Sequence, residues 1–139
     1  MKTVFLDTNV MIDILGRRQP FCPPSLLIMS LADRGILRIC VSALSYATAS
    51  YILSRFNKQM DVVSELAKFS KITVTTPVDS EVIDSSLRSD FNDFEDAIQY
   101  FSALKIKVDY IITRNKKDYA SAQIPVFEPQ EFIDYLLKE

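Results

Sequence analysis

The sequence contains no histidine and no tryptophan, and it has only two glycines and two cysteines in 139 residues. The lack of histidine excludes Ser-His-Asp and Cys-His nucleophilic catalysis, histidine general bases and histidine zinc sites. Gly16 and Gly35 do not form a glycine-rich phosphate loop. Cys22 and Cys40 lie in apolar stretches without metal-ligand spacing, which favours two buried free thiols and a reducing, cytoplasmic location. Acid–base or metal chemistry is therefore expected mainly from carboxylates.

The chain also lacks a strong net charge and a long hydrophobic run. Its net charge is −2 and its pI is about 5.2, so a basic field over the whole molecule is absent and any phosphate binding must be local. The apolar run at the amino terminus is interrupted by Asp7, which is typical of neither a signal peptide nor a membrane span. The length and the 48% apolar content predict a single globular domain over residues 1–139.

Short apolar runs alternate with longer segments of helical periodicity. Strands that are apolar on both faces and separated by helices indicate a sheet covered on both sides. The sequence therefore predicts an α/β fold of three layers, α/β/α, whose central, mostly parallel sheet of four to five strands is flanked by helices. The predicted strands are 3–6, 37–41, 72–75, 108–112 and 125–127, and the predicted helices are 8–15, 25–33, 43–57, 60–70, 80–88, 93–104 and 129–137.

Acidic residues stand where the site of such a fold is expected, at the carboxyl ends of the strands. Asp7 directly follows the first strand, and Asp93 and Asp96 open the helix 93–104. Asn115 and Asp118 come shortly after the fourth strand. Carboxylates gathered there would repel one another unless a cation lay between them, and hard oxygen ligands suit Mg²⁺ or Mn²⁺. Such an ion can activate water for attack on a phosphodiester.

Each of these side chains also has a purely structural alternative, so the argument depends on their convergence. Arg114 and the amino end of helix 93–104 are candidates for holding phosphate oxygens. Asp13 is expected on the exposed side of its helix. The alternatives are helix capping for Asp7, Asp93 and Asp96, a turn for Asn115 and Asp118, and a solvated face for Arg114, Lys116 and Lys117.

Three segments, VFLDTNVMIDIL, DFEDAIQYFSAL and DYIITRNKKDY, resemble in this order the signature blocks of the PIN-domain family, and PVFEPQEFI resembles the usual ending. The resemblance implies a PIN-like fold that cleaves RNA with Mg²⁺ or Mn²⁺ held by three or four acidic residues and leaves a 5′-phosphate. Many members are VapC-type toxins, each neutralised by an antitoxin protein. RNA and an antitoxin are thus the implied partners, together with a homodimer formed through the helices 25–33 and 42–57.

The resemblance also assigns expected roles within the site. It implies Asp7 and Asp96 as metal ligands and Asn9 as the residue that orients Asp7 by hydrogen bonding. Thr113 and Arg114 are expected to support them. The further candidates are Asp93, the frequent neighbour of the helical acid, and Asn115 or Asp118, one of which takes the place of a fourth acid.

One position departs from the family pattern. Thr48 stands where the family usually carries a glutamate, and no acid lies between Asp33 and Asp61. Asp93 or Glu95 is a candidate substitute; otherwise the activity is weakened, or the chain is a degenerate, non-catalytic PIN domain that binds RNA or a protein partner.

Another enzyme class, a receiver or a haloacid-dehalogenase-like phosphatase, also places an Asp after a strand. The phosphatase pattern needs an Asp where Asn9 stands, and the receiver pattern needs a Lys where Arg114 stands.

Overall fold

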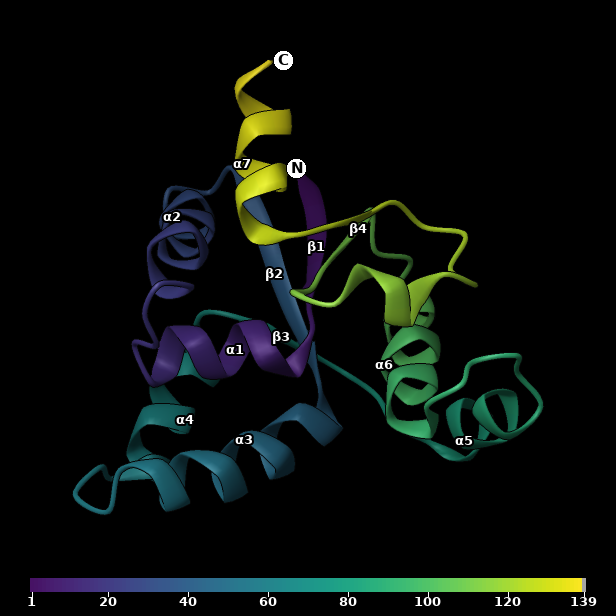
Figure 1. Ribbon diagram of the computed structural model, residues 1–139, viewed down its shortest axis with the longest axis horizontal. Coiled ribbons are helices and arrows are strands. Elements are labelled where there is room, and N and C mark those ends of the chain that lie inside the picture. Colours follow the sequence, from purple (N-terminus) through teal and green to yellow (C-terminus); the bar gives the residue numbers. More distant parts are fainter. Residues whose placement is uncertain (139) are drawn as a thin grey trace.

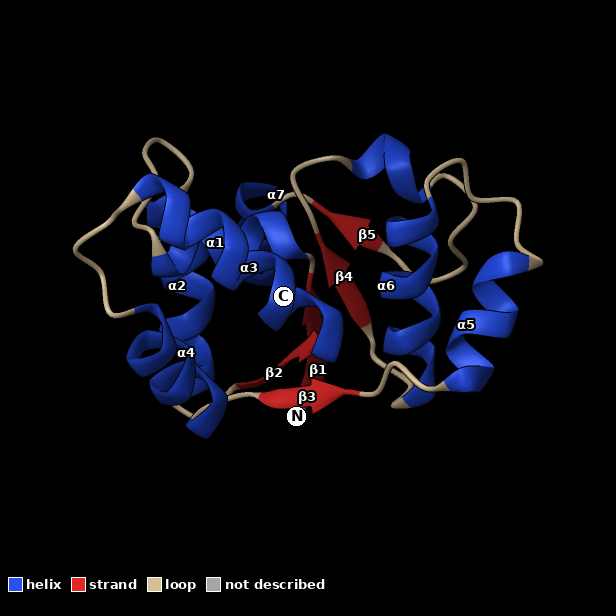
Figure 2. Cartoon of the chain, turned by 90° about the horizontal axis from the view of Figure 1, so that it is seen from below, coloured by secondary structure: helices blue, strands red, loops and turns tan. Residues whose placement is uncertain are grey.

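Five strands form one sheet in the order β3-β2-β1-β4-β5, and every neighbouring pair is parallel. The computed structural model describes residues 1–138, and its sheet lies between two layers of helices (Figure 2). The predicted α/β/α architecture is therefore confirmed. The strands are β1 (Lys2–Leu6) in the centre, β2 (Leu37–Ser42) and β4 (Tyr110–Ile112) beside it, and β3 (Val74–Thr76) and β5 (Val126–Phe127) at the edges.

The two helical layers differ in size, as Figures 1 and 2 show. The larger layer contains α1 (Thr8–Leu15), α2 (Cys22–Asp33), α3 (Ala43–Phe56), α4 (Val62–Lys71) and α7 (Pro129–Leu137). The smaller layer contains α5 (Ser80–Leu87) and α6 (Phe94–Lys105). A short 3₁₀ helix, η1 (Lys116–Tyr119), follows β4.

Each face of the sheet has its own apolar core, because successive side chains of a strand point to opposite faces. Val4 and Leu6 pack into the core beneath the larger layer, whereas Phe5 between them packs into the core beneath α6. All three side chains are completely buried. This two-sided burial explains why the central strands read as continuous apolar runs.

Every predicted strand and helix is present, with ends shifted by a few residues. The largest shift is in α2, which begins at Cys22 because Pro23 and Pro24 occupy its first turn. Gly35 follows α2 with φ of 76°, a left-handed conformation that terminates helices and favours glycine. Cys22 and Cys40 are buried and free, as predicted. Within residues 1–138, no helix has the length and apolar character needed to cross a membrane.

Candidate active site at the carboxyl edge of the sheet

Asp7 lies at the centre of the candidate site because it follows the central strand and begins α1. Its backbone N–H donates to the Ile112 carbonyl at 2.9 Å, which holds it against the end of β4. The residue is 7% exposed, and its carboxylate accepts hydrogen bonds from the Thr8 backbone at 2.7 Å, the Thr113 hydroxyl at 2.8 Å and the Gln99 amide at 3.3 Å. Asp7 is thus both a helix cap and a buried acid.

The charge of Asp7 is left without a counter-charge. All its hydrogen-bond donors are neutral, and no lysine or arginine among the described residues forms an ion pair with it. Burial raises the pKa of Asp7, although the hydrogen bonds from Thr113, Gln99 and Thr8 lower it. The fold therefore fixes the two oxygens of this carboxylate while leaving its charge uncompensated.

Gln99, which sequence reasoning missed, joins three helices beneath Asp7. It is 1% exposed and donates to the Thr8 hydroxyl at 3.0 Å and to the Ser45 hydroxyl at 2.9 Å, in addition to Asp7. It also accepts a hydrogen bond from the Ser42 hydroxyl. A buried glutamine needs several partners to offset its desolvation, and here they fix α6 relative to α1 and α3.

The segment after β4 is tied to the start of α1. The Asn9 amide donates to the Thr113 hydroxyl at 3.3 Å, and its oxygen accepts from the Arg114 backbone at 3.3 Å. The Asn115 backbone N–H also donates to the Thr113 hydroxyl, at 3.1 Å. Asn9 therefore reaches Asp7 through Thr113 rather than by a direct hydrogen bond.

Asp96 lies in the first turn of α6 and is partly buried. Its pKa is raised to about 7, first by burial and then by the negative charges of Asp7, Asp93, Asp118 and Glu95, in decreasing order. The fold therefore gathers Asp7, Asp93, Asp96 and Asp118 on the same side of the molecule. Asp93 is exposed and caps α6 by accepting from the Asp96 backbone N–H at 3.1 Å, the structural role that its spacing also allowed. After β4, the negative charge of Asp118 contributes to the raised pKa of Asp96.

Tyr119, also missed from the sequence, places its hydroxyl near these acids. The residue is 2% exposed, and its hydroxyl makes no hydrogen bond of regular geometry within residues 1–138. Burial raises its pKa well above the usual range, and the charges of Asp7 and Asp96 raise it further. A buried hydroxyl this close to Asp7 can donate to its carboxylate, and that interaction lowers the pKa of Asp7.

The donor set fits a hydrated Mg²⁺ or Mn²⁺ better than a tightly enclosed ion. No group of three or more acidic or cysteine side chains in the described part of the chain is close enough to hold a metal ion directly. Mg²⁺ commonly keeps several waters and binds through one or two carboxylates, and Asp7 and Asp96 are the candidates for such a pair. At the position where the family usually has a glutamate, the Thr48 hydroxyl donates to Glu95 Oε1 at 3.4 Å.

The prediction that Asp13 is exposed is wrong. Asp13 is completely buried, and it accepts hydrogen bonds from Arg114 Nε at 2.7 Å and from a terminal guanidinium nitrogen at 3.4 Å. Arg18 lies 3.7 Å away. The guanidinium of Arg114 also covers the ring of Phe21, 3.9 Å from its centroid. Arg114 is therefore the ion-pair partner of Asp13 rather than part of a solvated face. Lys116 pairs with exposed Glu131 at 3.1 Å, in keeping with a solvated face.

Comparisons with known proteins agree with this geometry. The family model of the PIN domain matches residues 3–117. Ribonuclease VapC1 of Aquifex aeolicus (strain VF5) is 25% identical over 136 residues, which cover 94% of this chain and 93% of the relative.

Solved structures show the same fold. One is VapBC2 from Rickettsia felis bound to a promoter DNA fragment, with a TM-score of 0.66, 17% identity and coverage of 91% of this chain and 97% of the other. Another is Mycobacterium tuberculosis VapC20, described as a sarcin-ricin loop cleaving toxin, with a TM-score of 0.63, 14% identity and coverage of 78% and 86%. The family model covers most of the chain and the same fold recurs in these structures, so the chain belongs to the PIN domain family.

Proposed function

We propose that this chain is an endoribonuclease that hydrolyses RNA phosphodiester bonds with Mg²⁺ or Mn²⁺. The observation that supports this most is the gathering of Asp7, Asp93 and Asp118 around partly buried Asp96, whose pKa is raised to about 7 by burial and then by their negative charges. Such mutual repulsion is relieved when a divalent cation binds. The name of the Aquifex aeolicus relative, a ribonuclease, points to the same activity.

In this proposal Asp7 and Asp96 hold the ion, and Asp118 contributes its charge from η1. The ion would lower the pKa of a water molecule and offset negative charge on the phosphodiester. Thr113, Gln99 and the Thr8 backbone keep Asp7 in one orientation, so that little reorganisation is needed when substrate binds. Water oxygen adds to phosphorus, the bond from phosphorus to O3′ breaks, and the released O3′ takes a proton. The products carry a 5′-phosphate and a 3′-hydroxyl.

We also propose that the chain is the toxin of a toxin–antitoxin pair. Structures that share its fold include VapBC2 from Rickettsia felis and a toxin–antitoxin complex from Klebsiella pneumoniae, the latter with a TM-score of 0.66. A homodimer through α2 and α3 remains a prediction, which size-exclusion chromatography with light scattering would test.

The test of the ribonuclease proposal is a cleavage assay on single-stranded RNA with Mn²⁺. Asp7→Asn and Asp96→Asn each keep the size of the side chain, and we expect each to lower the rate about a hundredfold. Asp33→Asn, at the exposed end of α2, is the matched control and should leave the rate unchanged. Equal rates in all four proteins would refute the site. RNA binding without cleavage by the wild type would favour the non-catalytic alternative.

A further inference from the structure

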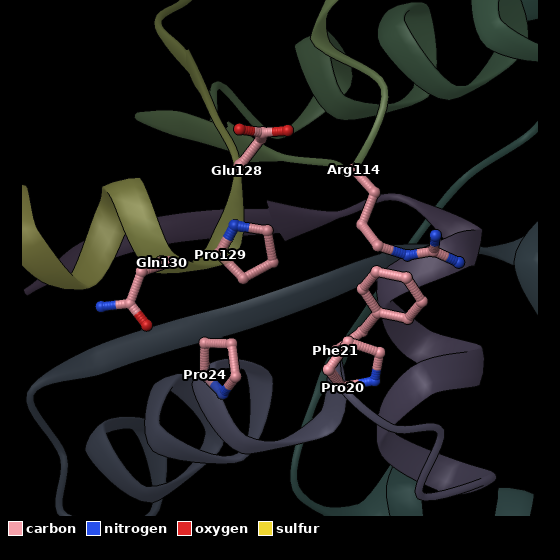
Figure 3. Close-up of a pocket in the computed structure, with 7 residues that line it drawn as sticks. All are labelled: Pro20, Phe21, Pro24, Arg114, Glu128, Pro129 and Gln130. Carbon is pink, nitrogen blue, oxygen red and sulfur yellow. The ribbon is translucent and has the colours of Figure 1, made fainter.

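A pocket of about 250 Å³ lies at the same edge of the sheet as the carboxylates, between the α1–α2 loop, the start of α2 and the start of α7 (Figure 3). It is connected to the candidate active site through the segment after β4. Arg114 forms one wall, and the preceding residue, Thr113, donates to Asp7 at 2.8 Å. The lining residues are Pro20, Phe21, Pro24, Arg114, Glu128, Pro129 and Gln130.

Flat rings form much of the wall of the pocket. Figure 3 shows the rings of Pro24 and Pro129 on opposite sides of the pocket, with the Phe21 ring beside them. The Arg114 side chain is held in one orientation, because it donates to the buried Asp13 and packs over the Phe21 ring. A preformed pocket of this kind loses little conformational entropy when a planar ring enters it.

The polar groups lie at the rim of the pocket. The Gln130 side chain points from α7 towards Pro24 (Figure 3), and its amide donates to Asp134 at 3.1 Å. Its oxygen accepts no hydrogen bond from any of residues 1–138, so it is available to a ligand. Glu128 adds a carboxylate that also caps α7. An apolar slot with a few hydrogen-bonding groups at its edge suits a heterocyclic ring.

We propose that this pocket binds one nucleobase of the RNA strand that is cleaved at the neighbouring carboxylates. The inference rests on the proposed ribonuclease function and adds a determinant of its sequence preference. The volume suits a single base, since pockets for drug-sized ligands start at about 300 Å³.

The test fills the pocket without touching the carboxylates. Gln130→Trp places a large ring into it from an exposed position, and Gln59→Trp makes the same change in the exposed turn between α3 and α4. We expect the wild type and Gln59→Trp to cut a random-sequence RNA with about a tenfold preference for one base at a fixed distance from the cut. Gln130→Trp should lose most of that preference. Gln130→Ala, which cannot disturb folding through bulk, should weaken it as well.

A second measurement is independent of cleavage. In EDTA, the four ribonucleoside 5′-monophosphates are titrated into Asp96→Asn while NMR follows the Arg114 Nε–H and the Gln130 amide. We expect at least one nucleotide to shift both signals at millimolar concentration, and we expect the Arg114 Nε–H signal to stay unshifted when Gln130→Trp is combined with Asp96→Asn. The same shifts with inorganic phosphate alone, or an unchanged cleavage preference in Gln130→Trp, would overturn the proposal and leave the ribonuclease intact. Shifts in Asp96→Asn together with a wild type that cuts no RNA would support the pocket and refute the ribonuclease.

Discussion

Two buried aspartates six residues apart in the chain, Asp7 and Asp13, differ in whether the fold gives them a positively charged partner. Asp13 lies against Arg114 and Arg18, whose charges lower its pKa against the larger effect of burial. Asp7 receives only neutral donors and has the acids of α6 and η1 nearby.

The difference separates a structural carboxylate from a reactive one. The fold supplies the counter-charge that Asp13 needs, whereas at Asp7 it supplies only orientation. A cation from solution would complete the second site. The predictions below test this contrast, starting with the largest effect.

Removal of the compensated acid should be the most damaging change. Asp13→Ala leaves the Arg114 guanidinium without its buried partner, and breaking a buried pair from one side costs about 3 kcal/mol or more. We expect urea unfolding to show that loss in stability, with Asp33→Ala, an exposed residue of α2, nearly unchanged. A loss below about 1 kcal/mol would mean that Asp13 is less important to the fold than its burial indicates.

Removal of an uncompensated acid should increase the stability of the metal-free protein, in contrast to removal of Asp13. The pKa of Asp96 is raised from 3.8 to about 7, so the folded state binds the proton more tightly than the unfolded state does. Its contribution to stability is present below about pH 4 and is lost as the pH rises through about 7. Asp96→Asn should therefore stabilise the metal-free protein at pH 8 by about 1–2 kcal/mol, after allowance for solvent screening.

The measurement is urea unfolding in EDTA at several pH values. The gain from Asp96→Asn should shrink towards pH 4, where the wild-type carboxyl is protonated in the folded state. A gain that stays constant with pH would show that the charge of Asp96 is not its cause.

A bound Mn²⁺ should relieve the same repulsion that Asp96→Asn relieves by mutation. Added Mn²⁺ should therefore stabilise the wild type. At ten times its dissociation constant, a ligand that binds only the folded state adds about 1.4 kcal/mol, which raises the unfolding midpoint of a domain of this size by about 4 °C. Calorimetry should show that shift for the wild type and for Asp33→Asn but not for Asp7→Asn or Asp96→Asn. An equal shift in all four would place the bound ion elsewhere.

Local pattern was sufficient to predict the fold and to bring Asp7 and Asp96 together. The apolar runs identified the strands, and the rule that parallel strands end at one edge located both acids. The side chains that contact these aspartates could not be predicted from local pattern. Asp13 looked exposed because a charged residue on a short helix usually is, and Arg114, which offsets its burial, lies 101 residues away in the chain. Gln99 and Tyr119 were missed because only tertiary packing turns them towards the acids.

Thr48 offers the smallest and most specific test of the contrast. Its hydroxyl already contacts Glu95, one of the acids that raise the pKa of Asp96, so a carboxylate there would add to the uncompensated charge. Thr48→Glu should slightly destabilise the metal-free protein, by about 0.5 kcal/mol, and tighten Mn²⁺ binding about threefold. Thr48→Gln, with the same length and no charge, separates the effect of charge from that of size. If titration calorimetry gave both variants the same Mn²⁺ affinity, position 48 would lie outside the reach of the ion, and Asp7 and Asp96 would have to hold it without help from α3.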